Sequence, residues 1–297
     1  MRSYYKQTIW NKIFDVFNVV FMILFMLTIL FPFWNQVCIS FSDVSTYPVS
    51  NITVLPLGFN AEAYQKVFSD VRILRASFIS VLRVVVGTCG TLLCTGLLAY
   101  VTSVEWFSGR KFVRRAFVIT MYFGAGLIPT YLAFISIGLY NTFWAYIVPS
   151  LFSAYYMLII GSYIQGLPSA LFEAARIDGS NELGIYFRIV MPISLPVFAA
   201  IAVYCAVDQW NSWFDTTIYV PSGKWDTLQI YLRRVLLEIE ALSMIEDTSK
   251  VASKFKTLTP QSIRAATTIV TTIPIVCVYP FAQKYFLSGI TIGAVKG

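Results

Sequence analysis

The sequence predicts an all-α protein that crosses a membrane six times, and three observations support this fold class. Of the 297 residues, 57% are hydrophobic and 12% are charged, and the mean hydropathy is +0.69; soluble domains carry about 25% charged residues. Six apolar segments have the roughly 20 residues that a helix needs to cross the hydrocarbon core. A short charged segment that ends in glycine lies between the fourth and fifth of them.

The first three predicted spans are residues 13–34, 76–101 and 116–137. The first is too long for a signal peptide and lacks a small-residue cleavage site, so we expect it to remain as a signal anchor. The second carries small side chains at helical spacings of three and four, which favours close helix packing: Ser80, Gly87, Gly90, Thr91 and Cys94. The third contains two glycines and a proline, which predict a kink.

The last three predicted spans are residues 142–164, 191–207 and 262–281. Pro149 lies inside the fourth span and Pro274 inside the sixth, and we expect both helices to bend there. The fifth span begins with two prolines. Proline is tolerated at the start of a helix because the first backbone N–H groups have no partner within the helix.

Six spans place both termini on the same side of the membrane, and the basic residues indicate which side. Eleven lysines and arginines lie in short segments on the terminal side, whereas the opposite short loop near Gly138 has none. The other two opposite segments carry three and seven basic residues, but the seven lie in a long loop, which weighs less in the rule. Cytoplasmic loops carry an excess of Lys and Arg, so both termini are predicted to be cytoplasmic. The domain layout is then a cytoplasmic N-terminus (1–12), a six-span domain (13–290) and a cytoplasmic C-terminal tail (291–297).

One long segment, residues 208–261, is too polar to span the membrane and is predicted to be an external loop. Within it, residues 228–237 have apolar side chains with Arg233 and Arg234 among them, a pattern that predicts an amphipathic helix on or near the membrane surface. Such a helix either contacts an external partner or packs on the outer ends of the bundle.

The charged segment between spans four and five has the features of a short docking helix. Pro168 and Ser169 can open it, and Glu173 lies near its positive N-terminal end. Ala174 and Ala175 leave room for another surface to approach closely. Gly179, after Asp178, can take the left-handed conformation that ends a helix.

These residues resemble the EAA loop of ABC importer permeases. Glu173-Ala174-Ala175 is followed after three residues by Gly179, after nine more by Ile189, and after two more by Pro192. Met191 stands where that family usually has leucine, a change that keeps volume and apolarity. The resemblance implies that residues 165–190 are a cytoplasmic coupling loop, with a helix that fits a cleft on an ATPase through Glu173, Ala174, Ala175, Asp178 and Gly179.

Other segments are similar to the carbohydrate-importer branch of that family, in particular to the maltose permease G subunit and to permeases for complex oligosaccharides. They are residues 126–131, 138–142, 280–286 and 293–297. The resemblance implies the type I ABC importer architecture, import of sugars, and the plasma (inner) membrane of a prokaryote. A separate hypothesis is that the C-terminal tail, ending in Gly297, reaches the ATPase, because the tail is predicted to be cytoplasmic and ends in short, flexible residues.

The same resemblance implies a set of partners: a second, related permease, two cytoplasmic ATPase subunits and an external sugar-binding protein. This chain has no Gly-x-x-x-x-Gly-Lys-Ser/Thr loop, so ATP and Mg²⁺ are expected on the partner ATPase and no cofactor in this chain. Histidine is absent and the five cysteines lie singly, so neither a catalytic nor a metal site is predicted. The basic residues form no stripe with interleaved aromatics, which argues against nucleic acid.

A cluster near the external end of span five combines flat aromatic faces with hydrogen-bonding groups, as sugar sites do. Its members are Tyr204, Asp208, Gln209, Trp210, Asn211 and Trp213. Tryptophan and tyrosine also gather at membrane interfaces, which is the alternative interpretation. Arg83 lies about two turns from the outer end of span two and is expected to snorkel to the surface, with a place in the transport pathway as the alternative.

Three other functions remain open on sequence alone. An ABC permease for a non-sugar solute would carry the same loop. A secondary transporter would show ion-coupling groups or repeated halves, and no internal repeat is visible. A membrane enzyme is disfavoured because histidine and clustered carboxylates are missing.

Overall fold

The computed structural model describes residues 9–243 and 259–294, which form helices and the loops between them, with one isolated bridge pair at Ser42 and Phe59. The predicted all-α class is confirmed for these residues. The chain divides into two compact units, one with residues 1–70 and 235–271 and the other with residues 71–234 and 272–297. Residues 295–297 of the predicted tail and 244–258 of the predicted external loop lie outside the described residues.

The first unit contains α1 (Ile9–Ser40), the short helix η1 (Val49–Asn51) and α2 (Glu62–Ser69). Its core gathers around the end of α1, where Cys38 and Ile39 pack with Ile52 and Ala265. Most apolar side chains along α1 are exposed within this chain, as Phe17 illustrates at 65%. A 32-residue helix of this hydropathy is long enough to cross a bilayer.

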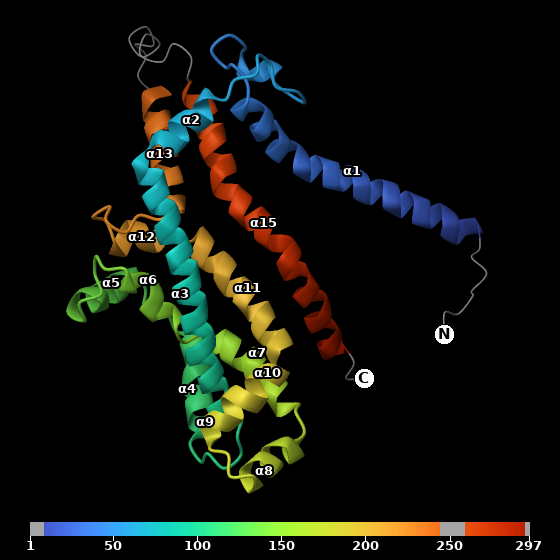
Figure 1. Cartoon of the computed structure of the whole chain (residues 1–297), viewed down its shortest axis with the longest axis vertical. Helices are drawn as coiled ribbons and strands as arrows, with labels where there is room; N and C mark the ends of the chain where they lie inside the picture. Colours follow the sequence, from blue (N-terminus) through green and yellow to red (C-terminus); the bar gives the residue numbers. More distant parts are fainter. Residues whose placement is uncertain (1–8, 244–258, 295–297) are drawn as a thin grey trace. The chain divides into compact units, whose positions relative to one another are not determined.

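The second unit is built on α3 (Val71–Val101), which packs along α11 (Leu195–Asn211) and α7 (Ala154–Gln165) (Figure 1). Small side chains allow this approach: Gly87 lies against the Gln209 side chain, and Gly96 against Tyr186 and Phe198. The close packing predicted for this helix is therefore confirmed. The Thr91 hydroxyl also donates to the Ser150 carbonyl at 2.8 Å, which links α3 to a neighbouring turn.

The remaining helices of the second unit are short: α4 (Arg110–Tyr122), α5 (Leu127–Ser136), α6 (Trp144–Ile147), η2 (Val148–Ser150), α8 (Ser169–Ile177), α9 (Glu182–Ile185), the π-helix η3 (Tyr186–Val190), α10 (Met191–Ile193) and α12 (Phe214–Tyr219). Two longer helices, α13 (Leu228–Ser243) and α15 (Pro260–Ala294), contribute residues to both units. The amphipathic helix predicted at 228–237 is thus present as the first part of α13.

The predicted spans differ in how continuous they are. By length and composition, α1 and α3 can each cross a membrane unbroken, and two further candidates are bent pairs. One pair bends by 44° after η2, next to Pro149, and the other by 82° between α10 and α11. Pro192 and Pro196 remove backbone donors at the second bend.

The third predicted span is divided into α4 and α5 by a non-helical break at residues 123–126, where Gly126 has φ +85°. That φ lies in the region that favours glycine, so the chain can turn there without strain. The predicted sixth span lies within α15, which is assigned as one helix through Pro274. The described residues therefore do not contain six continuous spans.

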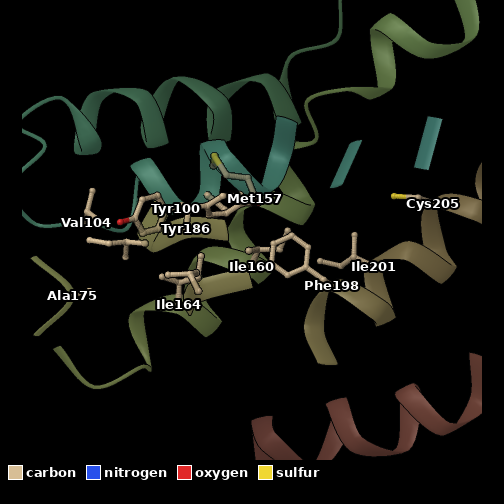
Figure 2. Packing of buried hydrophobic residues seen from close by; sticks show 13 residues of the cluster. Tyr100, Val104, Met157, Ile160, Ile164, Ala175, Tyr186, Phe198, Ile201 and Cys205 are labelled. Carbon is tan, nitrogen blue, oxygen red and sulfur yellow. The ribbon is translucent and has the colours of Figure 1, made fainter. Parts of the chain in front are cut away.

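A buried apolar cluster joins α3, α7, α8, η3 and α11 (Figure 2). Ile160 and Tyr186 have no exposed surface, and Phe198 and Ile201 are almost as buried. Between helices that cross a membrane, such side chains stabilise the fold mainly through close van der Waals packing. Figure 2 shows Ala175 of α8 at one edge of this cluster, so the short helix is attached to the main helices.

Candidate functional site

The helix α8 has a well-defined beginning and end. It begins at Ser169, directly after Pro168. At its other end the Gly179 N–H donates to the Arg176 carbonyl and the Ser180 N–H to the Ala175 carbonyl, both at 3.0 Å. This pair of bonds is the Schellman motif, and Gly179 takes the φ of +79° that the motif requires. The predicted stop at Gly179 is confirmed.

Polar contacts fix α8 to the rest of the unit. The Arg176 Nε donates to Glu182 Oε1 at 3.0 Å, and the Tyr100 hydroxyl donates to Glu182 Oε2 at 2.5 Å. Glu182 therefore bridges α8 to the end of α3. This bridge could not be predicted from the sequence, because Tyr100 and Glu182 are 82 positions apart.

The same contacts set the electrostatics of the bridge. Burial alone would raise the pKa of the Glu182 carboxyl, but the hydrogen bonds from Tyr100 and Arg176 together lower that pKa below its usual value. The hydrogen bond to Glu182 raises the pKa of the Arg176 guanidinium. Both groups are therefore charged at neutral pH, and the bridge is ionic.

The predicted coupling residues divide between an inner and an outer side of α8. Ala175 is only 5% exposed and packs in the chain's own core, so it is not open to a partner in this conformation. Glu173, Ala174 and Asp178 are exposed. Ile177 is 86% exposed, although it is apolar. The outer side thus presents a carboxylate, a small residue and an uncovered isoleucine.

A second candidate site surrounds Arg83, which is only 2% exposed. Its Nε donates to Gln209 Oε1 at 2.7 Å, and its two terminal nitrogens donate to the two carboxylate oxygens of Asp215. The guanidinium also lies over the Tyr146 ring, 4.4 Å from the centroid. The expectation that Arg83 snorkels is wrong: the partly buried carboxylate of Asp215, 132 positions away, compensates its charge.

A cavity of about 380 Å³ opens beside this ion pair. Arg83, Asp208, Gln209 and Asp215 all line it. The Gln209 amide also donates to the Ser150 hydroxyl at 3.0 Å. Donors and acceptors therefore line a space within the size range of small-ligand pockets, about 300–1,000 Å³.

The structure separates the six residues predicted for the substrate path. Asp208 and Gln209 line the cavity, and Trp210 is buried at 8% exposure. Tyr204 and Asn211 are exposed. Trp213 carries the Arg233 guanidinium 3.5 Å from its ring centroid.

Sequence reasoning overlooked Asp215, Tyr146 and Ser150. Asp215 and Tyr146 contact Arg83, and Ser150 contacts Gln209, which binds Arg83. The one indication of this site in the sequence was the position of a charged residue, Arg83, inside an apolar segment. Across residues 9–243 and 259–294, no cluster of three or more His, Cys, Asp or Glu side chains is arranged to hold a metal ion.

Known proteins resemble this chain over nearly its full length. No family model matches it. The polygalacturonan/rhamnogalacturonan transport system permease protein YtcP of Bacillus subtilis is 36% identical over 288 residues, which are 97% of this chain and 99% of YtcP.

Two crystal structures share the fold. One, of a bacterial ABC transporter involved in the import of the acidic polysaccharide alginate, matches with a TM-score of 0.84 and 25% identity, over 94% of this chain and 99% of that chain. The other, of a bacterial alginate ABC transporter in complex with alginate pentasaccharide-bound periplasmic protein, matches with a TM-score of 0.56 and 16% identity, over 93% and 96%. Because this chain is 36% identical to YtcP over nearly the full length of both proteins, it belongs to the family of ABC sugar transport system permeases.

Proposed function

We propose that this chain is one of two related permease subunits that together form the pathway of an ATP-driven oligosaccharide importer. Its 36% identical relative, a polygalacturonan/rhamnogalacturonan permease, and the alginate transporter of the same fold support a substrate built from several sugar units. An external binding protein would deliver that substrate. The second alginate transporter supports this step, since its crystal structure contains a periplasmic protein with bound alginate pentasaccharide.

The proposed topology has six membrane crossings, with both termini in the cytoplasm of a prokaryote. The two unbroken apolar helices and the two bent pairs would supply four crossings. The pair α4 and α5 and the helix α15 would supply the other two. The distribution of basic residues supports the cytoplasmic placement of the loop that carries α8.

The observation that carries the proposal is that one side of α8 is fixed to the rest of the unit while the other side is exposed. Its inner side is anchored through Ala175 and through the Glu182 bridge, while Glu173, Ala174 and Ile177 on its outer side are exposed. Because α8 is fixed to α3 and α7, a movement of a partner bound to its outer side can be transmitted to these two helices. The partner would be a cytoplasmic ATPase that binds ATP and Mg²⁺, so this chain needs no cofactor of its own.

The Arg83 cavity is proposed as a part of the sugar path. Asp208 and Gln209 offer hydrogen-bonding groups to sugar hydroxyls, and Tyr146 contributes an aromatic wall. Because Asp215 compensates Arg83, the cavity does not offer a free cation there. Its role would be to hydrogen-bond hydroxyl groups rather than to capture a carboxylate.

The test is purification of the tagged chain from its own cells, followed by reconstitution of the co-purified assembly in proteoliposomes. We expect a second permease, an ATPase and a sugar-binding protein to co-purify, and labelled oligosaccharide to accumulate only with ATP on the ATPase side. Oligogalacturonides and neutral oligosaccharides of equal length are the substrates to compare. Uptake by this chain alone, driven by an ion gradient without ATP, would contradict the proposal.

A further inference from the structure

A second cavity lies beside α8, near the C-terminal end of α3 at Val101. Its volume is about 640 Å³, and residues from the 102–106 turn, the start of α4, the end of α7 and α8 line it. We call it the basic cavity, because Arg110, Lys111, Arg114 and Arg176 are among its lining residues. None of the contacts that define the Arg83 cavity involves these side chains.

The basic cavity has an excess of positive charge, because four cations line it against two carboxylates, Glu105 and Glu173. Two of its four cations have carboxylate partners: Arg110 lies 3.8 Å from Glu105, and Arg176 is bound to Glu182. Within the described residues, Lys111 and Arg114 have neither an ion-pair partner nor a hydrogen-bond acceptor for their side chains. Two uncompensated cations beside a cavity attract an anion.

The level of the cavity in the proposed topology indicates which anion. Three lining segments lie where predicted spans meet the cytoplasm: residue 102 follows α3, residue 110 begins α4 and residue 165 ends α7. Trp106 lines the cavity and is 59% exposed, and exposed tryptophan is typical of the membrane interface. The phosphates of the lipid headgroups lie at this level.

We propose that the basic cavity holds the phosphate of an anionic phospholipid headgroup, bound mainly by Lys111 and Arg114. The proposal rests on the cytoplasmic placement of α8 in the proposed function. The main competing ligand is an acidic segment of the ATPase. The lipid is favoured because the lining segments lie at the ends of predicted spans and the exposed Trp106 lies among them, although Glu173, which is also expected to meet the ATPase, lines the cavity too.

The test compares lipid binding by the purified transporter assembly with and without the two cations. Native mass spectrometry and a spin-labelled lipid assay would measure retention of phosphatidylglycerol against phosphatidylcholine. Each basic residue near an anionic headgroup contributes roughly a fivefold factor, so Lys111→Gln with Arg114→Gln should weaken phosphatidylglycerol binding by about 25-fold. The control is Arg115→Gln, a cation of the same helix outside the cavity lining, which should change binding less than about twofold.

Several results would overturn the inference. Equal retention of the two lipids by the wild type, or a loss with Arg115→Gln as large as with the double variant, would show that no lipid site exists here. Competition by millimolar inorganic phosphate would indicate a site for free anions. Loss of the ATPase from the double variant, with unchanged lipid preference, would indicate ATPase docking. If ATP-driven uptake persists without any lipid preference, this inference fails alone; if no ATPase co-purifies, the proposed function fails.

Discussion

Removing the carboxylate from Asp215 should destabilise this protein strongly, because Arg83 would keep its charge without its partner. The Arg83 side chain is 3% exposed and that of Asp215 is 22% exposed, so water screens the pair little. Breaking a buried ion pair from one side costs about 3–5 kcal/mol. Gln209 and the Tyr146 ring would still contact the guanidinium, so we expect the lower end, about 3 kcal/mol, for Asp215→Ala.

The assay is thermal unfolding of the detergent-solubilised transporter, followed by tryptophan fluorescence. A loss of about 3 kcal/mol corresponds to a melting temperature lower by roughly 6–12 °C for a domain of this size. The double variant Arg83→Met with Asp215→Leu contains no buried charge and should stay within about 1 kcal/mol of the wild type.

The matched control is Asp226→Ala, whose partner Arg234 is 45% exposed. An exposed pair contributes at most about 1 kcal/mol. Equal shifts of the melting temperature in Asp215→Ala and Asp226→Ala, or a double variant as unstable as the single one, would refute the role assigned to the buried ion pair.

Two further predictions concern α8 and its bridge. Gly179→Ala should lower the free energy of unfolding by about 1 kcal/mol and reduce coupled ATP hydrolysis, because φ +79° strains any residue with a Cβ. The control is Gly124→Ala, which lies in open space without a positive φ and should be neutral; equal effects of the two variants would contradict this prediction. Glu182→Gln should lower stability by about 1 kcal/mol, because the Arg176 and Glu182 side chains are 38% and 35% exposed. Because the folded-state pKa of Glu182 lies below its usual 4.5, the carboxylate stabilises the protein above about pH 4.5 and loses that effect as pH falls through the folded pKa. The melting temperatures of the wild type and of Glu182→Gln should therefore converge in acid. A constant difference between them from about pH 7 to about pH 3.5 would count against the ionic bridge.

Hydropathy and spacing were sufficient to predict the all-helical class, the long helices α1 and α3, and the glycine-terminated helix α8. The bends were harder to predict. Prolines and glycines indicated where a span can break, but the 82° angle between α10 and α11 depends on tertiary packing. The division of the third span at Gly126 was expected only as a kink.

The partners of the site residues could not be predicted, because they are distant in sequence. Arg83 and Asp215 are separated by 132 positions and Tyr100 and Glu182 by 82, and a single sequence carries no signal for such pairs. Spacing also failed to distinguish Ala174 from Ala175. Only the packing of α8 on the core establishes that one of them faces inward and the other outward.

That difference between two adjacent alanines offers the most direct test of the coupling role of α8. In a background without native cysteines, Ala174→Cys should crosslink to the co-purified ATPase with a short bifunctional reagent and block ATP-driven uptake. Ala175→Cys should crosslink far less, because that position is 5% exposed in the chain's own core. Equal crosslinking at both positions, or none at Ala174→Cys in an assembly that hydrolyses ATP, would contradict the claim that the outer side of α8 receives the ATPase.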